Sequence, residues 1–284
     1  MIPLLLGAGV ALANPCDLLT DGMNDGAVVA SLYDGGLGRA HSPCPRNELG
    51  VTGGAYLLAD TANFYGHIVA GATLDGRWAV NDRVEVYGSA EAVRYDNVIG
   101  ALSSDYLGYG HTTVGASGVL WGGDRSVVAL NGKLVLPTAF GLYENSWPVG
   151  ADLGVAWAWA KSERFRAHAQ LGGVGSGAIT AASAQPRAGA EATGGVEWRF
   201  VKPVAVVADV EAGFGYTAPL DHLALGVGFR ARLGDRGGLE LAGLVPLAGR
   251  ERALAAAALR GNVRLGKIPD GPAPTPIPAP VVPK

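Results

Sequence analysis

Residues 187–200 read RAGAEATGGVEWRF, and the polarity of their side chains alternates along the chain. Apolar Ala188, Ala190, Ala192, Val196 and Trp198 alternate with Arg187, Glu191, Thr193, Glu197 and Arg199. Successive side chains of a β-strand point to opposite faces, so this stretch predicts a strand with one apolar and one charged face. At 14 residues it is far longer than the strands of soluble sheets, which average about 5 to 6 residues.

The same alternation recurs between Glu48 and Leu265 and predicts about twelve strands. They are expected at residues 49–58, 64–80, 83–95, 106–121, 126–137, 148–160, 164–174, 187–200, 204–216, 222–233, 238–246 and 252–265. An even number suits a closed antiparallel barrel, and strands of this length fit a tilted crossing of a bilayer. The predicted fold class is all-β, a closed antiparallel up-and-down transmembrane β-barrel of about 12 strands.

The connections between these strands alternate in length. Tight turns follow the even-numbered strands, at 81–82, 122–125, 161–163, 201–203 and 234–237. Longer loops follow odd-numbered strands, for example 96–105, 138–147 and 175–186. Bacterial outer-membrane barrels have short periplasmic turns and long external loops, so this alternation predicts the orientation of the barrel.

Aromatic residues gather at two levels of the predicted strands. The turn ends carry Trp78, Trp121, Trp157, Trp159, Trp198, Phe165 and Phe200, and the loop ends carry Tyr65, Tyr95, Tyr106, Tyr143 and Tyr216. Amphipathic rings favour the two interfaces of a membrane, so the two belts indicate a span between them.

With this strand pattern, loop alternation and pair of belts, residues 48–266 resemble the Gram-negative outer-membrane β-barrel proteins, a porin-like superfamily. The resemblance implies the outer membrane of a Gram-negative bacterium, contact with outer-membrane lipid and insertion by the barrel assembly machinery. The chain departs from the family pattern at its end, where Arg264-Leu265 replaces the usual terminal aromatic and a proline-rich tail follows. A soluble β-sandwich or solenoid is the alternative, although its strands would be shorter and its outer faces polar.

The composition excludes several other classes of protein. The 284 residues include 44 glycines, which argues against a helical protein, and no run of roughly 18 apolar residues indicates a transmembrane helix. The net charge of -3 gives no support to nucleic-acid binding.

Residues 1–13 are predicted to be a signal peptide. The apolar stretch ends in Ala11-Leu12-Ala13, a small-x-small pattern that places cleavage before Asn14. The stretch is short and lacks a basic region, which leaves open a true start upstream of Met1, and a buried N-terminal strand is the alternative.

Residues 14–47 are expected to form an N-terminal periplasmic segment. In an exported chain its two cysteines, Cys16 and Cys44, most simply form one disulfide. Two unpaired thiols are the alternative, and a metal site is less favoured because only His41 lies nearby.

Residues 267–284 read KIPDGPAPTPIPAPVVPK and hold seven of the 17 prolines. Such spacing forbids helix and sheet and favours an extended polyproline II segment. We expect a periplasmic tail that reaches a cell-wall or periplasmic partner.

If the apolar face of the barrel meets lipid, the opposite face lines the lumen with charges of both signs. The lumen-lining residues are expected to be Arg77, Arg83, Glu85, Glu91, Lys133, Asp152, Arg164, Arg166, His168, Glu191, Glu197, Arg199, Asp209, Glu211, Arg230, Arg232, Arg260 and Arg264, with Glu48, His67, Asp75 and Glu240. In the hairpin of the seventh and eighth strands, Arg164 should lie near Arg199 and Arg166 near Glu197.

Two functions follow from such a lumen. A charge-lined lumen can be a narrow pore or channel for small polar or anionic solutes. It can also be closed by salt bridges, so that the barrel is a structural anchor that presents its loops and tail to partners. Twelve strands lie between the filled barrels of about eight and the open ones of about 16 to 18, so the strand number does not decide.

Catalytic and cofactor sites find little support in the sequence. A hydrolase would need a nucleophile, a base and a carboxylate, and the candidates are His111 with Ser117, or His222 beside Asp221 with Ser103 or Ser104. The run Gly172–Gly177, GGVGSG, lacks the lysine and the following helix of a phosphate-binding loop. We therefore expect neither enzyme activity nor a cofactor or metal.

Overall fold

Each of the twelve alternating stretches forms β structure in the computed structural model, which describes residues 43–60, 65–99, 104–123, 125–139, 147–179, 186–215, 218–234, 236–249 and 252–266. The strands are β1 (Glu48–Asp60), β2 (Tyr65–Ala79), β3 (Val84–Ile99), β4 (Ser104–Gly108), β5 (Thr112–Gly122), β6 (Ser126–Leu136), β7 (Trp147–Ser162), β8 (Phe165–Ile179), β9 (Arg187–Val201), β10 (Val204–Phe214), β11 (His222–Leu233), β12 (Gly237–Ala248) and β13 (Arg252–Arg264).

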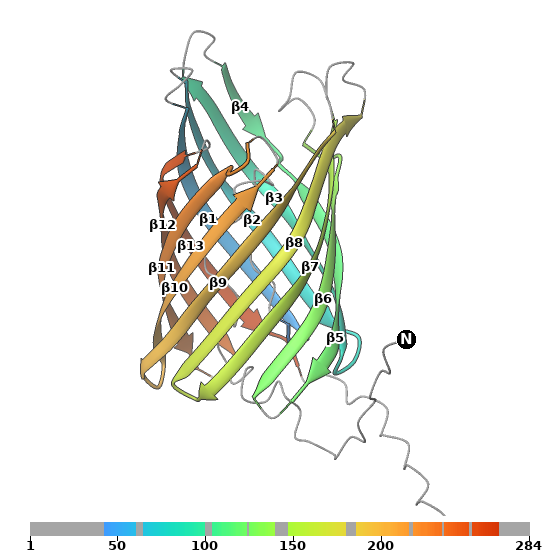
Figure 1. Cartoon of the computed structure of the whole chain (residues 1–284), viewed down its shortest axis with the longest axis vertical. Coiled ribbons are helices and arrows are strands. Elements are labelled where there is room, and N and C mark those ends of the chain that lie inside the picture. Colours follow the sequence, from blue (N-terminus) through green and yellow to red (C-terminus); the bar gives the residue numbers. More distant parts are fainter. Residues whose placement is uncertain are drawn as a thin grey trace, which may run out of the picture.

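The strands close into an antiparallel barrel (Figure 1). Neighbours in sequence pair with each other, and β1 pairs with both β2 and β13, so Glu48 lies opposite Arg77 on one side and Arg264 on the other. β4 and β5 both pair with β3, one along each half, and together fill one position of the wall. The barrel thus has twelve positions, and the predicted fold class is confirmed.

A β-bulge lies where the wall passes from β4 to β5. Thr73 of β2 pairs with Glu91, but the next pair joins Ala72 to Val93, so Ala92 is the extra residue of β3. Opposite it, the amide N–H of Gly110 donates to the carbonyl of Glu91, and a side chain at Gly110 would overlap the carboxylate of that glutamate. The bulge shifts the alternation of β3 by one residue, as bulges do.

The two faces of the wall differ in polarity as the alternation requires. The outer face exposes large apolar side chains along its whole height, among them Leu49, Val51, Leu74, Val86, Val114, Leu134, Leu153, Leu171, Val227, Phe229, Leu241 and Leu259. The buried inner face carries charged residues instead. A soluble sheet would bury the apolar face, so this inversion fits a wall surrounded by hydrocarbon.

The two ends of the barrel are distinct. The tight turns that begin at Val80, Gly123, Glu163, Lys202 and Gly234 lie together at the bottom of Figure 1, which we call the turn end, and the opposite end is called the loop end. Trp78, Trp121 and Trp198 project outward near the turn end with 58%, 56% and 57% of their surface exposed.

No helix with the length and apolar character needed to span a membrane occurs among the residues that the structure describes. The predicted signal peptide, the segment 14–42 with Cys16 and the tail 267–284 lie outside those residues, so these predictions and the Cys16–Cys44 disulfide stay predictions.

Candidate functional site: the charged lumen

The barrel encloses most of the charged residues that the alternation assigned to its inner face. Ten of them are at most 7% exposed, namely Glu85, Glu91, Arg166, His168, Glu197, Arg199, Asp209, Glu211, Arg230 and Arg260. Glu48, at 0%, and Glu240, at 3%, belong to the same set. Five others are partly buried, namely Arg77, Lys133, Asp152, Glu191 and Arg264.

Three of the expected residues lie in the tight turns or next to them. Arg83 directly precedes β3 and Arg164 lies in the turn between β7 and β8, and both are exposed, so their assignment to the lumen is wrong. β3 and β8 each begin one residue later than the alternation suggested, which leaves these two side chains in the turns. Arg232 is the last residue but one of β11, and its Nε donates a hydrogen bond to the carbonyl of Gly234 at 2.9 Å. The side chain of His67 lies outside the part of β2 that is described.

A row of alternating charge crosses the wall from β13 to β9. Arg260 faces Glu240, and Glu240 faces Arg230, in adjacent strand pairs. Nε of Arg230 lies 3.3 Å from Glu240, and its Nη1 lies 2.7 Å from Oε2 of Glu197. Opposite charges on adjacent strands stabilise one another, and here each guanidinium separates two carboxylates.

Three arginines lie around Glu197, and the expected neighbour Arg166 is one of them. Arg166 is its cross-strand neighbour in β8, and Arg199 lies 3.6 Å away. The third arginine beside Glu197 is Arg230. Arg164 contacts Arg199 instead, through a backbone hydrogen bond in which the N–H of Arg199 donates to the carbonyl of Arg164 at 2.8 Å.

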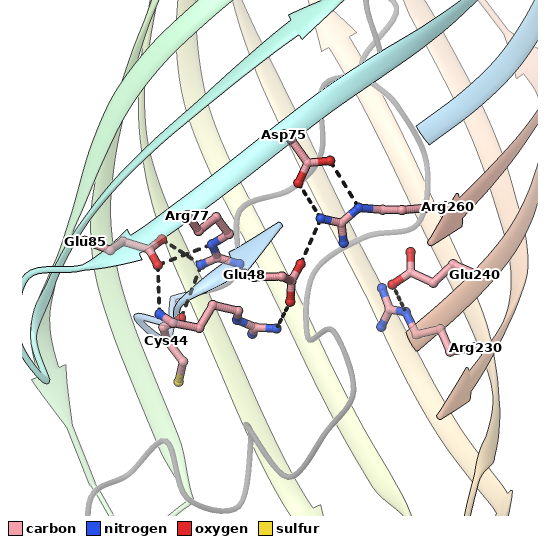
Figure 2. A network of polar contacts seen from close by, with 9 residues as sticks. Cys44, Glu48, Asp75, Arg77, Glu85, Arg230, Glu240 and Arg260 are labelled. Carbon is pink, nitrogen blue, oxygen red and sulfur yellow. Dashed lines mark hydrogen bonds and ion pairs between the residues drawn. The ribbon is translucent and has the colours of Figure 1, made fainter. Parts of the chain in front are cut away.

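A second cluster joins β1, β2 and β13, as Figure 2 shows. Nη2 of Arg260 lies 2.8 Å from Oε1 of Glu48 and 2.5 Å from Oδ2 of Asp75. Arg46, just before β1, approaches the other oxygen of Glu48 at 3.6 Å. The cluster thereby ties the first strand of the barrel to the last.

Residues 43–47, which we call the inner segment, lie inside the barrel at the turn end. All five residues are buried. Cys44 packs against Val127 of β6 and Ala158 and Ala160 of β7, with Val119 of β5 beside them. The residues just before β1 therefore occupy the lumen.

A polar contact from β2 and β3 holds this segment (Figure 2). Arg77 donates to both carboxylate oxygens of Glu85, at 2.6 and 3.2 Å, and also to the carbonyl of Cys44 at 3.2 Å. Glu85 in turn accepts the backbone N–H of Arg46 at 3.1 Å. The side-chain oxygen of Asn47 accepts the N–H of Ala79 at 2.8 Å.

Nearer the loop end, Arg94 is the centre of a separate cluster. Its guanidinium contacts Asp96 and Glu91, and donates to the hydroxyl of Tyr56 at 3.4 Å. The alternation of β3 would have placed Arg94 on the outer face, and the bulge at Ala92 turns it inward. Neither Arg94 nor Asp96 was expected in the lumen, because nothing in the sequence marks the bulge.

Further pairs of a basic and an acidic side chain lie elsewhere on the inner face. His168 is 2.8 Å from Asp209, His222 is 3.0 Å from Glu211, and Lys133 is 3.6 Å from Asp152. Burying a charge costs several kcal/mol unless a partner of opposite sign compensates, so this pairing is what allows so many charges inside the wall.

The first pair proposed for a hydrolase, His111 with Ser117, is not brought together. His111 lies beside Glu91, whereas Ser117 faces Glu85, six positions or about 20 Å further along the strand. His222 contacts Glu211, and Asp221 accepts the N–H of Ala218 at 2.6 Å. Ser103 and the side chain of Ser104 lie outside the described residues. Within the described ranges no group of three or more His, Cys, Asp or Glu side chains is placed to hold a metal ion.

No protein-family model matches the sequence, and no curated protein matches it significantly. Solved structures are similar in fold. The COG4313 outer membrane channel from Pseudomonas putida F1 has a TM-score of 0.60 and 14% identity, over 78% of this chain and 96% of the channel.

Two further structures match at lower scores. The KdgM porin in complex with disordered oligogalacturonate has a TM-score of 0.50 and 10% identity, over 76% of this chain and 99% of the porin. The β-domain of the Bordetella autotransporter BrkA has a TM-score of 0.51 and 12% identity, over 77% of this chain and 99% of that domain. The chain therefore has the closed-barrel fold of outer-membrane channels and porins, a fold that it shares with an autotransporter β-domain.

Proposed function

We propose that the protein is an outer-membrane barrel through which small polar or anionic solutes pass along a narrow, charged lumen. The observation that carries this proposal is the row of buried guanidinium groups on one wall, from Arg166, Arg199 and Arg230. A planar guanidinium binds carboxylate, phosphate and sulfate groups through two hydrogen bonds, so this wall suits anions.

The carboxylates in the same wall are equally important for passage. Glu197 and Glu240 lie between the arginines and compete with a solute for them. Conduction requires binding that is favourable enough for a solute to enter and weak enough for it to leave. The alternating charges supply that balance, and the likeness to a channel and to a porin solved with an anionic sugar polymer supports the same class of solute.

The two ends of the barrel support an outer-membrane location and an orientation with the turn end inward. The tight turns would face the periplasm and the long loops the exterior, as in outer-membrane barrels generally. The lipid of the outer membrane would contact the apolar face, and the barrel assembly machinery would insert the chain. The tail 267–284 would then lie in the periplasm and reach a cell-wall or periplasmic partner.

A second function is favoured by the filling of the turn end. Ion pairs and the inner segment occupy that end together. A barrel closed in this way would serve as an anchor that presents its loops and tail, and the likeness to an autotransporter β-domain is compatible with an anchoring role.

Conductance in planar bilayers separates the two functions. A pore gives discrete current steps. In a gradient of KCl across the bilayer, the reversal potential then shows a preference for chloride over potassium. An anchor gives a folded barrel that shifts on heating in gel electrophoresis and yet carries no current. A strongly cation-selective pore would contradict the proposed class of solute.

A further inference from the structure

The inner segment sits on a part of the wall whose inward side chains are small. Ala156, Ala158 and Ala160 follow one another on the inner face of β7, with Val127 beside them on β6. Arg166 of β8 is the ladder neighbour of Ala160, so the strands that carry the arginines begin directly beside these alanines. A chain segment can lie against the alanines, because no long side chain occupies that space.

Polar contacts, rather than a large apolar area, fix the segment in place. Glu85 is bonded at the same time to the guanidinium of Arg77 and to the backbone N–H of Arg46, and Arg77 also reaches the carbonyl of Cys44. We call this set of three hydrogen-bonding contacts the latch. If the side chains of Arg77 and Glu85 separate, the segment loses its hydrogen bonds to both of them at the same time.

The position of Arg46 inside the lumen is held at a cost. Burial, the largest cause, lowers the pKa of its guanidinium, and the nearby Arg77 lowers it further, while Glu48 opposes this shift. Released toward the turn end, the same side chain would regain water. The position of the segment inside the lumen therefore depends on these contacts, and the loss of one of them shifts the equilibrium toward release.

On these grounds we propose that the inner segment is a gate at the turn end of the pore. Seated on β6 and β7 and latched by Arg77 and Glu85, it narrows the passage beside Arg166, Arg199 and Arg230. Released, it leaves the passage open. The gate rests on the proposed pore function, since a barrel that conducts nothing has nothing to gate.

Two variants of the full-length chain act on separate contacts of the segment. Glu85→Gln keeps the shape of the side chain and weakens the latch. Ala158→Leu places a larger side chain where Cys44 packs against β7. Ala242→Leu is the matched control, because Ala242 lies on the inner face of β12 and packs against Val207. Heat-modifiable gel mobility checks that each of the three variants folds into a barrel.

Hydrogen exchange and conductance are then measured on the same preparations. Because the N–H of Arg46 is bonded to Glu85, its exchange in a peptide covering residues 43–47 reports directly on release. Loss of one buried charge-assisted hydrogen bond changes the ratio of open to closed states by about tenfold or more. We expect this factor in the exchange rate and in the open probability of both variants, and neither change in Ala242→Leu.

The possible results separate the gate from the pore. Faster exchange with unchanged current in a conducting barrel overturns the gate and leaves the pore intact. Faster exchange in a barrel that is silent in every variant overturns the pore and the gate with it. Unchanged exchange in both variants shows a fixed segment and also overturns the gate.

Discussion

Arg230 of β11 and Glu240 of β12 stand directly opposite each other in the strand ladder, with Nε of the arginine 3.3 Å from Oε1 of the glutamate. Both side chains are almost fully buried, at 2% and 4% exposure. The same guanidinium reaches Glu197 of β9 at 2.7 Å, so one cation joins three strands. If Arg230 were removed, the carboxylates of Glu197 and Glu240 would stay buried without this partner.

Replacing Arg230 by leucine should therefore destabilise the barrel by roughly 3–5 kcal/mol, the usual cost of breaking a buried ion pair from one side. Adding Glu240→Gln should recover about 0.5–3 kcal/mol, because neighbouring groups couple by that amount. The free energy of unfolding in lipid vesicles is measured by urea titration. Arg232→Leu is the control, because the Nε of Arg232 donates an exposed hydrogen bond to the carbonyl of Gly234, and it should cost about 1 kcal/mol or less. Equal losses in both single variants would contradict the account.

A charge on the outer face should be penalised according to depth. Val227 lies halfway along β11 and is 45% exposed, whereas Leu233 ends the strand and is 56% exposed. Lysine at position 227 should cost about 2–4 kcal/mol and lysine at position 233 about 0–1 kcal/mol if hydrocarbon surrounds the middle of the wall. Folding titrations into vesicles give both values. Equal costs at the two depths would argue for water outside the barrel.

Ion selectivity should depend on the inner arginines and not on those of the turns. The double variant Arg166→Gln and Arg199→Gln removes two buried cations from one wall, so the reversal potential in a KCl gradient should move toward cations. Arg83→Gln with Arg164→Gln removes the same charge from exposed turn positions and should leave that potential nearly unchanged. A similar shift in both pairs would mean that surface charge, rather than the lumen, sets the preference.

Truncation after Gly266 should leave the barrel intact. Among the described residues, the seam ends with the hydrogen bond that the N–H of Leu265 donates to the carbonyl of Asn47 at 2.9 Å, and it survives this deletion. An extended tail of 18 residues spans about 56 Å at 3.1 Å per residue, so its loss should abolish binding to a periplasmic partner without changing heat-modifiable mobility. A cysteine placed at Lys284 that is labelled on intact cells would contradict the topology.

The sequence predicts the wall well because a strand between lipid and a polar interior must alternate at every position. β9, for example, begins at the expected Arg187 and ends one residue later than expected, at Val201. The same rule fails at a bulge, since Ala92 looks like any other small residue and yet turns Arg94 and Asp96 inward. It also fails at strand ends, where one residue more or less moves Arg83 out of the lumen.

The contents of the lumen were harder to predict, because they depend on contacts between distant parts of the chain. The register of adjacent strands correctly placed Arg166 beside Glu197. Arg230 reaches Glu197 from two strands away, a distance at which the strand pattern gives no direct pairing. The inner segment itself shows no alternation of polarity. The sequence feature that relates to its position is the run of inward alanines on β7, against which it packs.

The ion pair of Glu48 with Arg260 joins residues 212 positions apart, across the seam where the barrel closes. Contacts so distant in the chain form slowly, and this one cannot form before the thirteenth strand has been synthesised. A slip of one residue at the seam would also turn every side chain of a strand to the wrong face. Arg46 lies beside Glu48 from within the same stretch of chain, but the shorter contact with Arg260 is made only when the last strand docks in the correct register, so closure of the barrel completes the neutralisation of Glu48.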